Sequence, residues 1–211
     1  MNALKYKDCV VQRGLTYHYY YSPAAPGKPT LFFVHGFPST SFDWSRQVAF
    51  FEPKGYGLLV PDCLGYGGTS KPTHHEAYRW KLLVQDLVDV LDAEHLNIVV
   101  GIGHDWCALR LVSGADTLLT PASVIDRGSA LLSTLMHHHA GRFCGFAWIA
   151  LSYLPPATTE FVVDKAIAAF KEKTGSDCIG YQKFFTEPDA PELSLKHVSD
   201  TGRTCSATHV A

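Results

Sequence analysis

A carboxylate at a sharp turn is the most reactive arrangement in this sequence. Asp105 lies in the motif Gly101-Ile-Gly-His-Asp-Trp106, at the end of the apolar run 98–102. A strand-to-helix turn here would lift the Asp105 side chain into a site, as the G-x-S-x-G motif does for serine. A carboxylate held in this way can attack an electrophilic carbon and form an ester. For an isolated Asp105, a helix N-cap would be the favoured interpretation, because this position favours aspartate.

Two other motifs also follow short apolar runs. His35-Gly36-Phe37-Pro38 follows the run 31–34, and the glycine-rich segment 62–70 follows the run 58–60. Because buried parallel strands end at one edge of a sheet, these loops are expected beside the Asp105 turn, although ordinary connecting turns would look similar. Backbone N–H groups of the 35–38 loop could point into a pocket and bind an oxyanion. The glycine spacing matches neither common phosphate-binding motif, which disfavours a nucleotide site.

The elements that must position these motifs alternate along the chain. Short apolar runs indicate strands and longer periodic segments indicate helices, a pattern typical of α/β proteins. A chain of 211 residues fits one domain. The predicted strands are residues 9–12, 15–22, 31–34, 58–60, 98–102 and 143–151, and the predicted helices are 40–51, 77–95, 129–139 and 161–172.

Composition narrows the classes of partner. The chain is 46% hydrophobic and 18% charged with a net charge of −2, so no basic footprint indicates nucleic acid. No apolar run reaches the roughly 18 residues that a membrane span needs, and the N-terminus lacks the core of a signal peptide. The six cysteines form no C-x-x-C pair. We therefore expect a cytoplasmic protein with reduced thiols and a small, neutral substrate.

Histidine invites a metal interpretation at one place, His137-His138-His139. Consecutive helical residues point about 100° apart, so these three side chains cannot converge on one ion. We expect neither a metal nor a cofactor.

Taken together, the three motifs resemble signatures of the epoxide hydrolase branch of the α/β-hydrolase fold superfamily, over about residues 8–196. The resemblance implies that Asp105 is the nucleophile and that the Phe37 and Trp106 amides form the oxyanion hole. It also implies that Tyr181 hydrogen-bonds to the epoxide oxygen, although Tyr181 could instead pack in an aromatic core. Substrate binding or loop support is the implied role of four further residues: His35, Gly36, Pro38 and Trp44.

The resemblance also implies a division of the chain. Residues 1–156 would form the α/β-hydrolase core, with the N-terminal part of a mostly parallel sheet. Residues 157–199 would begin a helical cap, and residues 200–211 would be an unstructured tail.

Two other functions are compatible with these residues. Haloalkane and haloacid dehalogenases share the aspartate nucleophile, but they commonly carry a halide-binding asparagine where this chain has Phe37. Phenylalanine cannot donate a hydrogen bond to a halide, so Phe37 favours an epoxide. A non-catalytic, mis-spliced product is the other alternative.

The sequence departs from the family at two places. Residues 107–127 separate Trp106 from Gly128, the glycine that the family places directly after this tryptophan. We interpret these 21 residues as an atypical insertion, consistent with a retained intron. The resemblance fades beyond residue 197, and the last sheet strands, the catalytic histidine and the acid are missing. The resemblance therefore implies a truncated chain that is impaired or inactive, limited to forming the ester.

Overall fold

The computed structural model describes residues 1–104, 128–150, 153, 168 and 171–175. The strands are β1 (Tyr6–Val10), β2 (Thr16–Ser22), β3 (Thr30–Val34), β4 (Gly57–Pro61), β5 (Val99–His104) and β6 (Phe143–Ile149). The α-helices are α1 (Ser45–Phe51), α2 (Trp80–Ala93) and α3 (Gly128–His139). Short 3-10 helices are η1 (Ala3–Lys5), η2 (Ser41–Trp44), η3 (Glu52–Lys54), η4 (His75–Tyr78) and η6 (Ala140–Arg142).

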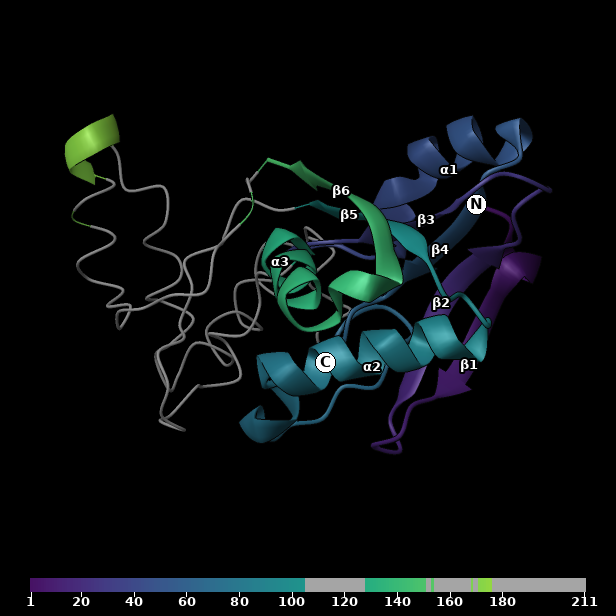
Figure 1. Ribbon diagram of the computed structural model, residues 1–211. Helices are drawn as coiled ribbons and strands as arrows, with labels where there is room; N and C mark the ends of the chain where they lie inside the picture. The colour runs from purple at the N-terminus through teal and green to yellow at the C-terminus, as the bar shows by residue number, and fades with distance from the viewer. Residues whose placement is uncertain (105–127, 151–152, 154–167, 169–170, 176–211) are drawn as a thin grey trace, which may run out of the picture.

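The six strands form one mixed sheet in the order β1-β2-β4-β3-β5-β6 (Figure 1). β1 and β2 form an antiparallel hairpin, and β2 pairs antiparallel with β4. β4, β3, β5 and β6 run parallel to one another. The predicted α/β class is therefore confirmed, and the parallel strands bring their carboxyl ends to one edge.

Helices cover both faces of the sheet (Figure 1). Alternate side chains of β3 point to opposite faces: Phe32 packs in the cluster that contains α2 and α3 residues, whereas Phe33 packs with α1 and η2 residues. Every residue of β3 and β4 is buried. This two-sided burial explains why these strands are continuous apolar runs in the sequence.

Several predicted boundaries were wrong. The first strand begins and ends earlier than residues 9–12, because the chain turns at Gly14, where φ is +76°. The predicted helix 40–51 divides into η2 and α1, and the predicted helix 77–95 divides into η4 and α2. The predicted strand 143–151 ends at Ile149. Most of the predicted helix 161–172 lies outside the described residues, although residues 171–174 are helical.

β5 also differs from its prediction in an informative way. The strand spans Val99–His104 instead of residues 98–102, so Gly103 and His104 lie within it rather than in the turn that follows. A methyl group added to Gly101 would lie 2.5 Å from a Leu132 methyl carbon, and one added to Gly103 would lie 2.7 Å from the Gly128 carbonyl oxygen. These two glycines let α3 pack directly onto the backbone of β5.

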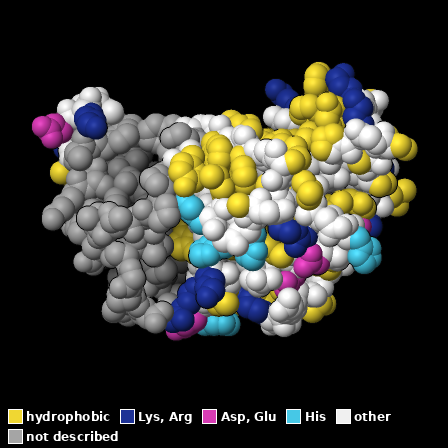
Figure 2. Space-filling view, viewed as in Figure 1, with side chains coloured by type: hydrophobic (Ala, Val, Ile, Leu, Met, Phe, Trp, Pro, Cys, Tyr) yellow, Lys and Arg dark blue, Asp and Glu magenta, His cyan; other side chains and the backbone are white. Residues whose placement is uncertain are grey.

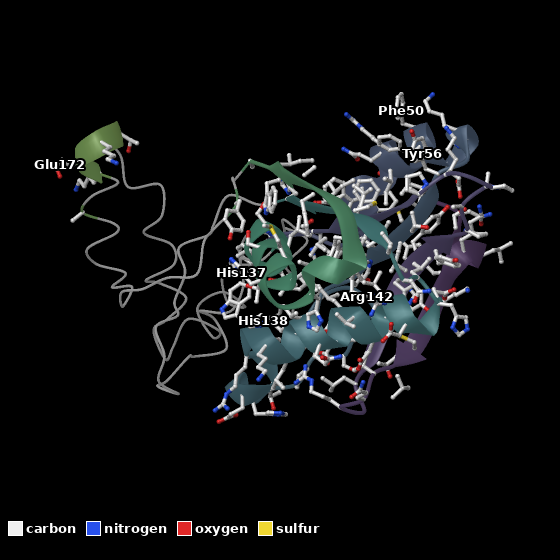
Figure 3. The ribbon with its side chains drawn as sticks, viewed as in Figure 1. Phe50, Tyr56, His137, His138, Arg142 and Glu172 are labelled. Carbon is white, nitrogen blue, oxygen red and sulfur yellow. The ribbon has the colours of Figure 1, made fainter. Side chains whose placement is uncertain are left out.

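Arg142 fixes the start of β6 (Figure 3). Its guanidinium donates to the carbonyls of Asn97 and Leu96, at 3.1 and 2.8 Å, and pairs with Asp92 at 2.7 Å. β6 thereby docks beside the loop that leads into β5. β6 is an edge strand among the described residues.

The surface over α1 exposes hydrophobic side chains with lysines beside them (Figure 2). The Lys54 ammonium lies 4.3 Å from the Phe50 ring centroid, and the Lys28 ammonium lies 4.9 Å from that of Tyr56. These contacts place cations over aromatic faces. In the described part of the chain, no helix is both long and apolar enough to cross a membrane.

A buried ionic cluster ties the N-terminal hairpin to α2. The Asp86 side chain is fully buried, and its carboxylate accepts hydrogen bonds from both Arg13 and the Tyr17 hydroxyl, the latter at 2.9 Å. Arg13 also donates to the Ala77 carbonyl at 2.9 Å. Burial, together with the Asp86 charge, raises the pKa of Tyr17 well above its ordinary value, so Tyr17 remains a donor.

We predict that Asp86→Ala destabilises the protein by about 3–5 kcal/mol, because it leaves the Arg13 charge and the Tyr17 hydroxyl without their buried acceptor. The control is Asp89→Ala, one turn along α2, which removes hydrogen bonds to Gln12 that are exposed. This control should cost about 1 kcal/mol. Urea unfolding of both variants measures the difference, and equal losses would contradict the prediction.

Candidate active site

The loops predicted to form the site lie at one edge of the sheet. β3 and β5 pair in parallel, with Val34 opposite Gly103. The segment that begins at His35 therefore leaves the sheet beside the position that follows His104. The Phe37 loop therefore begins next to the end of β5, and Asp105 is the residue that follows β5 in the sequence.

His35 supports the loops rather than opening toward a ligand. Its side chain is buried, and Nδ1 lies 2.8 Å from the Gly36 carbonyl oxygen. The Cys63 amide donates to Nε2 at 2.9 Å. Because an amide N–H can only donate and a carbonyl can only accept, the ring is the neutral tautomer protonated at Nδ1. His35 thus joins the loop after β3 to the loop after β4.

Asp62 also connects the segment after β3 to the loop after β4. Its buried carboxylate accepts hydrogen bonds from the Ser41 amide at 2.7 Å and from the Gly68 amide at 2.9 Å. A methyl group on Gly67, where φ is +47°, would lie 1.9 Å from an Asp62 oxygen. The glycine-rich segment is therefore shaped to let its backbone approach this carboxylate.

The other residues of the first motif differ in exposure. Gly36 is buried, Phe37 is half-buried against the core on the α2 and α3 side, and Pro38 is exposed. The Phe37–Pro38 peptide bond is cis. Pro38 is therefore the member of this motif most open to a ligand.

Trp44 is a packing residue at this edge. Its ring lies 4.7 Å from the Phe33 ring and 6.1 Å from the His104 ring, measured between centroids. The indole is buried, and Nε1 has no hydrogen-bond partner within the described structure. Its position beside His104 supports the end of β5 directly.

α3 begins against the ends of both central strands. A methyl group on Gly128 would lie 2.0 Å from the His104 carbonyl oxygen and 2.8 Å from that of Val34. The Ser129 hydroxyl donates to the Gly103 carbonyl at 3.2 Å. The positive end of this helix therefore lies at the position after His104, where a negative charge is stabilised.

The residues to which the family resemblance assigns the most direct chemical roles lie outside the described residues: Asp105, Trp106 and Tyr181. The structure thus brings together the supporting residues His35, Gly36, Phe37 and Trp44. It also adds two that sequence reasoning missed. These are Cys63 and Ser129. Cys63 acts through its backbone amide, which no residue type in the sequence marks. Ser129 could have been found only from its position directly after Gly128.

The three histidines are the last residues of α3, and Figure 3 shows His137 and His138 there. His137 Nε2 lies 2.6 Å from the Tyr153 hydroxyl, and the His138 and His139 ring centroids are 6.5 Å apart. Partial burial lowers the pKa of His139, helped by the neighbouring His138 and Arg142 charges. The described residues contain no group of three or more side chains able to hold a metal.

We predict that Asp62→Ala costs about 2–3 kcal/mol of stability, because the buried Ser41 amide loses a charged acceptor. Asp62→Asn keeps one acceptor oxygen and should lose about half as much. The control is Asp43→Ala, an exposed carboxylate nearby, which should change stability by less than about 0.5 kcal/mol. Urea unfolding of the three variants tests this order, and a loss for Asp62→Ala no greater than the control would contradict it.

Two known proteins that are similar in sequence to this chain are both named epoxide hydrolases. The chain is 31% identical over 179 residues to epoxide hydrolase A of Mycobacterium tuberculosis, covering 85% of this chain and 47% of that protein. It is 30% identical over 174 residues to bifunctional epoxide hydrolase 2 of Mus musculus, covering 82% of this chain and 26% of that protein. The chain therefore spans half or less of the length of these relatives.

Solved structures share the fold. An epoxide hydrolase from Vigna radiata superposes with a TM-score of 0.70 at 21% identity, over 96% of this chain and 56% of that one. Epoxide hydrolase A from Mycobacterium thermoresistibile superposes with a TM-score of 0.65 at 24% identity, over 92% and 53%. The model of the alpha/beta hydrolase family matches residues 31–201, most of the chain. On this match and this fold, the chain belongs to the alpha/beta hydrolase family.

Proposed function

We propose that this chain carries the nucleophilic half of an epoxide hydrolase, with Asp105 as the nucleophile and a small, neutral epoxide as the substrate. The observation that carries the proposal is the end of β5. The strand ends at His104, beside the end of β3 and against the start of α3, and Asp105 is the next residue in the sequence. The similarity to proteins named epoxide hydrolases supports the choice of substrate.

The first chemical step forms an ester. An Asp105 carboxylate oxygen attacks a carbon of the strained ring, and the bond between that carbon and the ring oxygen breaks with its electrons moving to oxygen. The resulting alkoxide takes a proton, for which we propose the Tyr181 hydroxyl as the donor. The positive end of α3 favours the ionised form of the attacking carboxylate.

The second step is hydrolysis of the ester. Water attacks the ester carbonyl, and we propose that the Phe37 and Trp106 amides stabilise the oxyanion. This step also needs a general base to take a proton from the water. No histidine of this sequence matches the family's base, so we propose that the ester accumulates on this chain.

We predict that incubation with an aryl epoxide adds one substrate mass to the protein. Asp105→Asn should abolish the adduct, because an amide is a far weaker nucleophile than a carboxylate. Asp43→Asn is the control for a nearby exposed carboxylate, and it should retain the adduct. Intact-mass spectrometry followed by peptide mapping measures both the adduct and its position.

Three outcomes would contradict the proposal. An adduct that persists in Asp105→Asn would place the reaction elsewhere, and steady diol release would show that the chain completes the hydrolysis. Halide release from a haloalkane, without reaction of the epoxide, would instead indicate a dehalogenase.

A further inference from the structure

We propose that residues 107–127 interrupt a turn that is otherwise complete, and that Gly128 is the residue that closes the turn behind Asp105. The functional turn would then consist of Gly103-His104-Asp105-Trp106 joined to Gly128-Ser129. The part of this inference that concerns Asp105 rests on the proposed function. The part that concerns the closing of the turn rests on packing alone.

The contacts at Gly128 are backbone contacts. A methyl group added there would lie 2.0 Å from the His104 carbonyl oxygen, closer than real side-chain atoms approach. The same methyl would lie 2.8 Å from the Val34 carbonyl oxygen. Only glycine therefore fits between the ends of β3 and β5, and α3 begins in contact with the residue that precedes Asp105.

The distance between the end of β5 at His104 and the start of α3 at Gly128 sets the number of residues needed to join them. A four-residue turn joins positions whose Cα atoms lie within about 7 Å, with two residues between them. His104, Asp105, Trp106 and Gly128 would supply those four positions in order. The sequence instead places residues 105–127 between His104 and Gly128, which is 21 residues more than such a turn requires.

The elements on both sides of the insertion are already packed together. The Ser129 hydroxyl lies 3.2 Å from the Gly103 carbonyl oxygen and 3.4 Å from that of Ile149, so the first turn of α3 is tied to β5 and β6. Leu132 packs against both glycines of β5. Joining Trp106 to Gly128 would therefore require no new arrangement of α3 on the sheet.

Two deletions of equal length test this inference. The first, Δ107–127, places Gly128 directly after Trp106. The second, Δ108–128, places Cys107 there, before Ser129, so the two products differ only in whether glycine or cysteine occupies the closing position. We expect Δ107–127 to melt at or above the temperature of the full chain, because a long connection is replaced by a short one. We expect Δ108–128 to melt about 5 °C or more below Δ107–127, because the cysteine Cβ meets the His104 carbonyl.

A pair of substitutions in the full chain tests the same contact without any deletion. Gly128→Ala should lower the melting temperature by several degrees. Gly141→Ala is the matched control, because a methyl group at this exposed glycine would meet no atom within 4 Å. The inference is overturned if Gly128→Ala lowers stability no more than Gly141→Ala. Equal melting of the two deletions, or a Δ107–127 chain less stable than the full chain, would overturn it as well.

The epoxide reaction separates this inference from the proposed function. If both hold, Δ107–127 should form the adduct at least tenfold faster than Δ108–128, and Asp105→Asn in Δ107–127 should abolish it. A Δ107–127 chain that is the more stable of the two but forms no adduct would support the closing role of Gly128. That outcome would count against Asp105 as an epoxide nucleophile.

Discussion

Backbone atoms of three segments meet at the carboxyl edge of the sheet, and no side chain fits between them. Gly128 at the start of α3 lies against the carbonyl groups of His104 and Val34, and Gly103 lies against the Gly128 carbonyl. This close approach fixes α3 on β5 and directs its positive end toward the next position in the strand. A larger side chain at either glycine would push the helix away and remove that alignment.

Two buried, hydrogen-bonded side chains, His35 and Asp62, hold the loops around this point. His35 connects the Gly36 carbonyl to the Cys63 amide, and Asp62 connects the Ser41 and Gly68 amides. In each case one side chain satisfies backbone groups from two different loops. Such groups cost free energy when buried alone, so the pairing makes the loop arrangement specific as well as stable.

The sequence predicted some of this well for a physical reason. β3 and β4 are buried on both faces, so their apolar runs could be identified without knowledge of the fold. Gly103 was misinterpreted as part of a turn, because glycine serves both for tight turns and for close packing, and the neighbouring residues do not distinguish the two. The hydrogen bonds of Asp86 were not predictable either, since they join residues 69 and 73 positions apart in the sequence.

The candidate site also has features that the sequence predicted and features that it did not. The three site motifs could be identified because each follows a buried strand. The hydrogen bond between His35 and Cys63 could not, because it depends on a backbone amide that the sequence does not mark. The two chemical steps also make different demands on the chain. Ester formation needs a carboxylate held in a fixed direction, and the described contacts at His104 and Gly128 fix the backbone on which the proposed nucleophile would depend. Hydrolysis needs a base placed over the ester. The close packing at the end of β5 is built from backbone contacts that need no reacting group, so stability at Gly128 and the proposed reactivity of Asp105 can be separated by experiment.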